Sequence, residues 1–551
     1  MSKRETLTAE VVIVGAGAVG GLMATRLAAA GMKVVVLDAG ARVDRATAVQ
    51  RFHDHPWGGT NSPYADAAWA PVPDEDKAGV FYGQDIPAGT PPTEQLEFKG
   101  LYLRQVGGSS WHFTAHAERF YPADFEMKTR YGRGVDWPIG YKALEPWYAE
   151  AEKEWGVAGN AHCLGPERTT GFPMPAVPMS YLDLTVAKAV HALGKDKEWP
   201  VGPYPHARNS VPGYDGRPQC CGNSSCRYIC PINAKYDGSV HVAKAEKLGA
   251  WVMPERVACD VVIGNSGRVE KIRYLRRDGA EGEAIGKIFI IAAHAIESAK
   301  LLLMSNVANS SGAVGRYLTA SIDMSSKGYA TDPVWPFRGP VSATGGVGGL
   351  RDGDFRKQHS AVATFIINGG FDGTLRGPTG EVAAALNDGL IGEDLRKRVH
   401  DRAARQVRLV SSMEVLPIEG NRVTVDPTRR DALGLPYPKV DFRIDQYTLD
   451  GCRVAVERDV QILQAMKASD IQKADWQKPE VGNAMIAGTT RMGEDSKTSV
   501  VDADCRSHDH DNLYVVGTSV YPTITICSPT LTAAALALRT ADAIIKRGLP
   551  L

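Results

Sequence analysis

Short apolar runs flank an amphipathic segment at the beginning of the chain. Val11–Val14 and Val34–Leu37 are apolar throughout and rich in β-branched residues, as in strands buried on both faces. Between them, Ala18–Ala30 has a helical pattern and is followed by Gly31, where a helix stop is expected. The pattern therefore predicts a strand, a helix and a second strand, which is the βαβ unit of a parallel sheet.

Three glycines occupy the predicted turn between the first strand and the helix. Gly15 allows a tight turn, Gly17 lets the backbone approach a pyrophosphate, and Gly20 lets the helix pack closely on the strand. The helix N-terminus offers free N–H groups and a positive dipole end to phosphates. Asp38, at the end of the second strand, can accept hydrogen bonds from a ribose diol. The motif predicts a bound dinucleotide, either NAD or FAD.

A second strand-and-helix unit lies near the C-terminus and bears on that choice. Asp511–Thr523 predicts a turn, a strand and a loop. Thr530–Lys546 predicts a long helix, with Ser528 or Thr530 as its N-cap and Gly548 beyond its end. A helix N-terminus directed at a flavin pyrimidine would stabilise the negative charge of the reduced flavin. A dinucleotide motif at the first strand, closed by a C-terminal segment, favours FAD; an ordinary βα unit is the alternative interpretation of this segment.

The middle of the chain contains two kinds of sequence pattern. Lys287–Ser305 predicts a strand, a tight turn and a helix of the nucleotide domain, whereas Trp251–Gly279 predicts strands joined by polar turns. From Thr331 to Lys473, Gly, Pro and charged residues interrupt short strands, which indicates a sheet-rich second domain. The predicted fold is α/β (α+β overall). We assign residues 1–155, 211–330 and 474–551 to a Rossmann-like FAD-binding domain, 156–210 to the substrate domain or a linking segment, and 331–473 to the substrate domain.

Composition excludes several classes of partner. The 551 residues carry 63 Lys+Arg and 63 Asp+Glu, so nothing favours binding to nucleic acid or to an acidic membrane surface. No apolar run is long enough to span a membrane, and the first ten residues lack the apolar region of a signal peptide. Taken alone, these features predict a cytoplasmic protein. Nine mostly dispersed cysteines do not resemble a disulfide framework.

Four of the nine cysteines are crowded into the polar segment 219–231. They are Cys220, Cys221, Cys226 and Cys230. Thiolates are soft ligands suited to iron–sulfur clusters, and a short Gly/Asn/Ser loop can bend round one. Zinc is the rival metal, although adjacent cysteines are awkward for tetrahedral spacing. Inert thiols are the third alternative.

Several motifs together resemble the glucose–methanol–choline (GMC) family of flavoprotein oxidoreductases. They are the N-terminal glycine fingerprint, "VGGSSWH", "IIAAHAIESAKLLL", "AGTTRMGED" and "VVDADCRSHDHDNLYVVG". The resemblance covers nearly the whole chain. The segment "RPQCCGNSSCRYICPINAKYDG" is similar to one branch, the large subunits of bacterial fructose, gluconate and FAD-dependent glucose dehydrogenases.

The resemblance implies a GMC fold, FAD, and oxidation of a hydroxyl of a sugar, polyol or glycoside. It implies further FAD contacts from Gly107, Gly108, Ser109, Ser110, Val257, Ala292, Gly517 and Thr530. Cys220, Cys221 and Cys226 match the ligands of a [3Fe–4S] cluster, and Cys230 matches a spare cysteine. Such a cluster would pass electrons singly from the flavin to an external acceptor. The branch also implies a small Tat-signal subunit, a multihaem cytochrome c subunit, and a periplasmic or membrane-associated location reached by export with the partner, with a cytoplasmic enzyme as the alternative.

The chain departs from the family where a proton acceptor is needed. Met485 occupies the position of the family's catalytic His, and Ser528 occupies that of its second His or Asn. Methionine cannot accept a proton, and serine is a poor base. Other departures are "LTASI" at Leu318–Ile322 and His294 in place of glycine. Three explanations compete: His112 or His116 replaces the base, the reaction needs no such base, or the chain is a catalytically divergent subunit. Packing or flavin contact is the structural alternative for His112, and a pocket-lining or surface role for His116.

Overall fold

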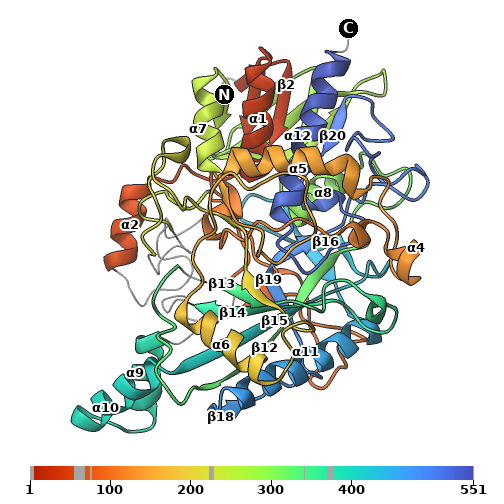
Figure 1. Cartoon of the computed structure of the whole chain (residues 1–551). Coiled ribbons are helices and arrows are strands. Elements are labelled where there is room, and N and C mark those ends of the chain that lie inside the picture. The colour runs from red at the N-terminus through yellow and green to blue at the C-terminus, as the bar shows by residue number, and fades with distance from the viewer. Residues whose placement is uncertain are drawn as a thin grey trace.

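The computed structural model describes residues 5–54, 69–74, 77–222, 229–340, 342–368 and 377–549. Within these residues the chain builds three main sheets with helices packed around them (Figure 1). The N-terminal pattern is confirmed, because both predicted strands form and the helix ends one residue earlier than expected, at Ala29.

A parallel sheet forms the nucleotide-binding half, with strand order β20-β11-β2-β3-β7. Its strands are β2 (Val11–Val14), β3 (Val34–Leu37), β7 (Trp251–Met253), β11 (Ile288–Ile291) and β20 (Leu513–Val515). Its helices are α1 (Ala18–Ala29), α5 (Tyr141–Trp155), α7 (Ser239–Lys247), α8 (Ala295–Ser305) and α12 (Thr530–Arg547). Helix α1 packs between α7 and α12, and α5 covers α12. Strands β2 and β20, from the two ends of the chain, belong to this one sheet, and helices α1 and α12 pack against each other beside it. Both ends of the chain thus build the nucleotide-binding half (Figure 1).

A smaller sheet with strand order β1-β10-β9-β8 accompanies the parallel one. Its strands are β1 (Glu5–Thr8), β8 (Arg256–Ile263), β9 (Val269–Arg276) and β10 (Glu281–Ile285). Strand β1 pairs parallel to β10, whereas the other pairs are antiparallel. The predicted strands between Trp251 and Gly279 are thus confirmed as β7, β8 and β9.

The third sheet is antiparallel and lies at the opposite end of the molecule (Figure 1). Its strands are β5 (Val201–Pro203), β12 (Thr319–Tyr329), β13 (Ser342–Val347), β14 (Val362–Asn368), β15 (Gln406–Glu414), β18 (Ser469–Gln472) and β19 (Glu480–Ala487). Helices α6 (Tyr181–Ala192) and α11 (Gln446–Ala465) bury one of its faces with Leu182, Val186, Leu409, Ile462 and Leu463. The other face is left for the cavity described below. The domain boundaries given above remain a prediction.

Shorter elements complete the described fold. They are β4 (Val157–Ala158) with β6 (His206–Ala207), the hairpin β16 (Arg422–Arg430) and β17 (Pro436–Asp441), α2 (Arg45–Asp54), α3 (Ala78–Phe81), α4 (Met127–Tyr131), and the pair α9 (Gly377–Asn387) and α10 (Gly392–Ala403). Helix α10 is largely exposed, as its charged sequence predicts. Among the described residues, we find no helix with the length and apolar character needed to cross a membrane.

One irregularity in the antiparallel sheet positions a candidate site residue. Ala320 of β12 pairs with Ile486 of β19, but Ile322 pairs with Val481. Residues 482–485 of β19 therefore bulge out of the ladder opposite Ser321 alone. The bulge carries Met485, which lies next to the resumed pairing.

Candidate active site

One cavity of about 810 Å³ joins the glycine turn of the nucleotide-binding half to the exposed face of the antiparallel sheet. Fourteen of the predicted site residues line it, namely Gly15, Gly17, Asp38, Gly108, Ser109, Ser110, His112, His116, Val257, Ala292, Met485, Gly517, Ser528 and Thr530. Gly20, Gly107 and the described cysteines are not among its lining residues. The tertiary structure thus brings residues from both ends of the chain and from its middle to one space.

The glycine turn has the geometry that its motif requires. Gly15 has φ of +102°, and a Cβ there would lie 2.5 Å from the carbonyl oxygen of Ala292. A Cβ on Gly20 would lie 1.9 Å from the carbonyl oxygen of Gly15. At Gly17 the nearest protein atom to such a Cβ is 4.0 Å away, at Gly108. A side chain at Gly15 or Gly20 would therefore collide with the protein backbone. The lack of a side chain at Gly17 instead leaves a space at the N-terminus of α1 that a pyrophosphate fits.

Asp38 is held in place by backbone amides at the end of β3. Its carboxylate accepts hydrogen bonds from the N–H of Ala16 (2.7 Å) and of Gly40 (2.8 Å). Burial raises its pKa, although these two hydrogen bonds and Arg104 oppose the shift. Each carboxylate oxygen keeps further acceptor capacity toward the cavity that it lines, which a ribose diol would use.

A buried ionic cluster near Asp38 was not anticipated from the sequence. Glu297 accepts hydrogen bonds from the hydroxyl of Tyr102 (2.5 Å) and pairs with Arg104 (2.7 Å). Burial raises the pKa of Glu297, but Arg104 and Lys300 outweigh it and hold the pKa at about 2. All four side chains line the cavity. The sequence signal was the spacing of Glu297 and Lys300, which is that of neighbours on one helix face.

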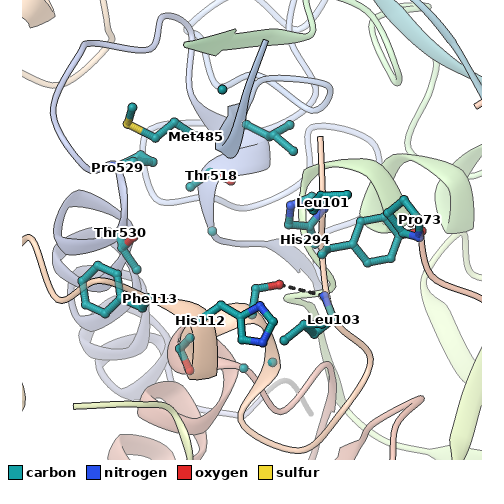
Figure 2. Close-up of a pocket in the computed structure, with 18 of the residues that line it drawn as sticks. Pro73, Leu101, Leu103, His112, Phe113, His294, Met485, Thr518, Pro529 and Thr530 are labelled. Carbon is teal, nitrogen blue, oxygen red and sulfur yellow. Dashed lines mark hydrogen bonds between the residues drawn. The ribbon is translucent and has the colours of Figure 1, made fainter. Parts of the chain in front are cut away.

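His294, which replaces a glycine expected from the resemblance, retains a glycine-like backbone with φ of +68°. Its Nδ1 accepts a hydrogen bond from the N–H of Ile296 (3.3 Å) at the start of α8, and its ring lies 5.0 Å from that of Tyr102. Figure 2 shows His294 beside Leu101, across the pocket from Met485 and Pro529. The imidazole therefore compensates for the strained backbone by capping a helix.

The segment Gly108–His112 forms a 3-10 turn along the cavity wall. Gly107 has φ of +100°, and a Cβ there would lie 2.4 Å from the indole nitrogen of Trp111. Ser109 accepts a hydrogen bond from the N–H of Leu103 (3.0 Å; Figure 2), and Ser110 accepts one from the N–H of Gly238 (2.7 Å). Both serine side chains are thus committed to shaping the turn, so that the segment presents its backbone to the cavity.

Met485 and Ser528 both line the cavity, as the resemblance implies for the catalytic pair. In Figure 2, Met485 lies on the same side of the pocket as Pro529 and Thr530. Ser528 lies 3.2 Å, oxygen to oxygen, from the hydroxyl of Thr530. The expected N-cap is wrong, because Pro529 occupies that position and no side chain caps α12. The first amides of this helix consequently remain available at the cavity.

His116 is a buried imidazole held between aromatic rings. It stacks on Phe365 and Tyr204, with ring centroids 5.2 Å and 5.3 Å away. Its Nε2 lies 3.0 Å from the carbonyl oxygen of Ala343, which can only accept, so Nε2 carries the proton and Nδ1 is the basic nitrogen. Burial lowers its pKa to about 4. His116 is therefore a neutral imidazole with one nitrogen able to accept a proton. His112 lines the same cavity and lies below it in Figure 2.

Glu118 is a second unanticipated titratable group near Ser528. Its side chain is fully buried, and burial raises its pKa to about 7 against the opposing effects of Arg351 and the backbone N–H of Ser528. Arg351 is also buried and donates to Sγ of Cys527. A carboxyl group with a pKa near neutral thus lies next to the backbone of Ser528, the residue at the position of the family's second base.

The face of the antiparallel sheet that lines the cavity forms a polar wall, which we define as Asp323, Ser325, Arg408 and Ser412. All four line the cavity, two from β12 and two from β15. Asp323 lies opposite Ser412, whose hydroxyl donates to its Oδ1 (2.5 Å), and Nε of Arg408 donates to Ser325 (2.7 Å). Sequence reasoning missed this wall. The alternation of polar residues at 321, 323 and 325 was the available signal, since side chains two apart share a face.

The described parts of the cysteine segment, residues 219–222 and 229–231, do not line the cavity, and Ile229 shares an apolar cluster with Trp111 of the 3-10 turn. Cys230 is buried, Cys220 packs against Cys230 and Ala234, and Cys221 is exposed. Cys226 lies outside the described residues. Arg208 links this segment to the cavity wall, because it donates to Sγ of Cys220 (3.7 Å) and to the carbonyl oxygen of Thr114 (3.1 Å). Within the part of the chain that the structure describes, no three His, Cys, Asp or Glu side chains form a metal-binding group.

Comparison with known proteins identifies the family. Residues 417–537 match the family described as GMC oxidoreductase, and residues 11–76 match the one described as Ketopantoate reductase PanE/ApbA. The chain is 36% identical over 560 residues to a fructose dehydrogenase large subunit from Gluconobacter japonicus, covering 98% of each chain. It is 27% identical to a 2-methyl-1,2-propanediol dehydrogenase from Mycolicibacterium austroafricanum, covering 98% of this chain and 95% of that one.

Solved structures agree on the fold. An FAD-dependent oxidoreductase from Chaetomium thermophilum aligns with 98% of this chain and 99% of its own, with a TM-score of 0.62 at 14% identity. The fold of this chain is thus a known architecture. From the full-length similarity and the family match together, the chain belongs to the GMC oxidoreductase family and is an FAD-dependent oxidoreductase.

Proposed function

We propose that this protein is an FAD-dependent dehydrogenase that oxidises a hydroxyl of a sugar, polyol or glycoside. The observation that carries the proposal is a continuous cavity that joins a dinucleotide-binding turn to a polar wall. The full-length similarity to a fructose dehydrogenase large subunit and to a diol dehydrogenase supports this substrate class.

The residues of the cavity fit FAD. Gly17 and the amides at the start of α1 would hold the pyrophosphate, Asp38 would hold the ribose, and the open N-terminus of α12 would favour negative charge on the flavin. We assign contacts also to Gly108, Val257, Ala292, Gly517 and Thr530, which line the cavity. FAD, when bound, supplies the acceptor for the hydride that leaves the substrate carbon. The hydroxyl proton must then pass to a base of the chain or to water.

We assign the role of that base to His116, with His112 as the second candidate. Support comes from the position of both on the cavity and from the unprotonated Nδ1 of His116. Met485 and Ser528 occupy the family's base positions but cannot take up a proton unaided. If another residue serves as the base, the enzyme can stay active although Met485 and Ser528 replace the family's bases. Such an active enzyme would still need the cavity and the complete flavin motif.

Electrons would leave the flavin through a [3Fe–4S] cluster bound by Cys220, Cys221 and Cys226, with Cys230 as the spare thiol. Soft thiolates suit such a cluster. The contact between Cys220 and Cys230, and the Arg208 link from Cys220 to Thr114 on the cavity wall, agree with a relay near the flavin. An external acceptor would then receive the electrons one at a time.

We extend the proposal to the assembly. The similar protein from Gluconobacter japonicus is named as a large subunit. By analogy, a small Tat-signal subunit and a multihaem cytochrome c subunit would accompany this chain, and place it in the periplasm or at the membrane. A cytoplasmic enzyme is the alternative.

A second candidate function follows from Met485 and Ser528. A catalytically divergent FAD and iron–sulfur subunit would bind both cofactors but act on a non-sugar substrate or serve as an electron-carrying partner. The loss of both family bases is the observation that favours it.

Anaerobic reduction of the flavin separates the two functions. Purified protein would be mixed without oxygen with sugars, sugar alcohols and glycosides, while the flavin absorbance is followed. We expect bleaching by at least one of them. Flavin that dithionite reduces but that no hydroxyl compound reduces would overturn the dehydrogenase and favour the divergent subunit.

A further inference from the structure

Asp323 presents an open carboxylate oxygen to the cavity. Its Oδ1 accepts the hydroxyl of Ser412 across the β12–β15 pair, which fixes the orientation of the carboxylate. Its Oδ2 accepts no hydrogen bond from any described residue, although the side chain is only partly exposed and lines the cavity. A carboxylate enclosed in this way accepts hydrogen bonds strongly, because few waters compete for it.

A glycine without a side chain leaves space beside this oxygen. Gly482, the first residue of the β19 bulge, lines the cavity, and a Cβ there would lie 2.9 Å from Oδ2 of Asp323. It would lie 2.3 Å from the hydroxyl of Ser321. Any side chain at position 482 would therefore crowd Asp323. The same bulge carries Met485, which occupies the family's catalytic position. Asp323 therefore lies beside the irregular part of β19 that holds this residue.

The charges around Asp323 favour a neutral ligand rich in hydroxyls. Burial raises its pKa to about 6, whereas Arg408 lowers it and Glu480 raises it. The carboxylate is thus mainly ionised at neutral pH and has a cation nearby. Together, Asp323, Ser325, Arg408 and Ser412 offer acceptors and donors along one wall, which matches hydroxyl groups that both donate and accept.

We propose that Asp323, oriented by Ser412 and exposed by Gly482, is a binding subsite for non-reacting hydroxyls of a neutral polyhydroxylated substrate. The subsite deepens the function proposed above and rests on it. Oδ2 would accept a hydrogen bond from a substrate hydroxyl, while the wall around it takes the neighbouring ones. A carboxylate that only binds should affect the affinity for the substrate and not the rate of flavin reduction at saturation.

The test uses the FAD-loaded protein and the variant Asp323→Asn, with D-fructose, sorbitol and 1-propanol as probes. We expect the dissociation constants for D-fructose and sorbitol to rise about ten- to a hundredfold, as for loss of a hydrogen bond to a charged group. The limiting rate of flavin reduction should change little, and 1-propanol, which has no second hydroxyl, should be unaffected. Gly482→Ala, which crowds Oδ2 without removing its charge, should act in the same direction.

Asp394→Asn is the matched control. Asp394 is exposed on helix α10 and does not line the cavity. This variant should leave both constants unchanged. A fall in the limiting rate with unchanged affinity in Asp323→Asn would overturn the subsite, as would binding of D-glucosamine in preference to both neutral probes.

A binding readout separates failure of the subsite from failure of the proposed function. The thermal unfolding midpoint of the oxidised protein would be titrated with sorbitol and D-fructose, which requires no turnover. If no compound reduces the flavin, a midpoint rise in the wild type that Asp323→Asn abolishes still supports the subsite. A rise that persists in the variant overturns it.

Discussion

The ammonium of Lys235 donates a hydrogen bond to the carbonyl oxygen of Trp111 at 2.7 Å, and thereby ties the chain that follows the cysteine segment to the cavity wall. Lys235 is fully buried and donates also to the carbonyl oxygen of Phe113 (2.7 Å). Buried ammonium groups are tolerated only when several acceptors surround them. The contact couples the chain after Cys230 to the turn that lines the proposed flavin site.

Replacing Lys235 by Met should destabilise the protein. The carbonyl oxygens that it holds would be left buried without their donor, at a cost of about 3 kcal/mol. We expect a lower thermal unfolding midpoint and a lower flavin content in the purified variant. Lys546→Met, at an exposed position of α12, should change neither. An unchanged midpoint in Lys235→Met would contradict the anchoring role.

Replacing Gly17 by Val should abolish bound FAD without unfolding the chain. The nearest protein atom to a Cβ at Gly17 is 4.0 Å away, so the added side chain meets the pyrophosphate space rather than the protein. Flavin content, measured by absorbance, checks this, and the circular dichroism spectrum should be unchanged. Gly171→Val, which has no atom within 4 Å of its Cβ, is the control and should stay yellow. Tight NADH binding by a colourless wild type would refute the cofactor assignment.

The cysteine segment should bind iron. We expect about three irons per chain and the EPR signal of an oxidised [3Fe–4S] centre in the wild type. Cys226→Ser and Cys220→Ser should each remove the signal, because the cluster depends on each thiolate. Cys259→Ser should retain it, because Cys259 lies in β8, where its thiol donates to the carbonyl oxygen of Arg273. Stoichiometric zinc without iron would end this proposal.

The catalytic base can be located by two opposing substitutions. His116→Phe keeps a ring between Tyr204 and Phe365 but removes the basic nitrogen, so it should lower the rate of flavin reduction about 10²–10⁴-fold if His116 is the base. Met485→His with Ser528→Asn should then help little. If the site instead lacks a base, the double variant should raise the rate. Fast reduction in both the wild type and His116→Phe would leave neither explanation standing.

The buried Glu118 should make stability depend on pH in a defined direction. Its pKa in the folded protein is raised from 4.5 to about 7, so the folded state holds this proton more tightly than the unfolded state. The stability due to the proton is fully present below pH 4.5 and is lost as the pH rises through 7. Relative to wild type, Glu118→Gln should therefore gain stability between these values, on the order of 3 kcal/mol in total.

Thermal midpoints of both proteins across this pH range measure the effect. Glu457→Gln, at an exposed position of α11, should run parallel to the wild type. A constant difference between wild type and Glu118→Gln at all pH values would show that Glu118 does not titrate in this range.

Local sequence determined the elements and the cofactor class. Val11–Val14, the three glycines and Asp38 lie within one βαβ unit, where periodicity and turn chemistry act over short distances. The replacement of the family's base residues by Met485 and Ser528 could also be recognised from the sequence, because each residue lies inside a recognisable motif. The predictions for β11, α8 and α12 held for the same reason.

Only the tertiary structure decided which distant groups meet in the cavity. Asp323 faces Gly482 because β19 bulges opposite Ser321, and no local pattern in β12 predicts the register of a strand about 160 residues away. His116 is neutral because Tyr204, Phe365 and Ala343, all far along the chain, bury it and fix its tautomer. Burial and partner identity depend on packing between remote segments, so the protonation states of Glu118, His116 and Asp323 follow from the fold and not from their neighbours in sequence.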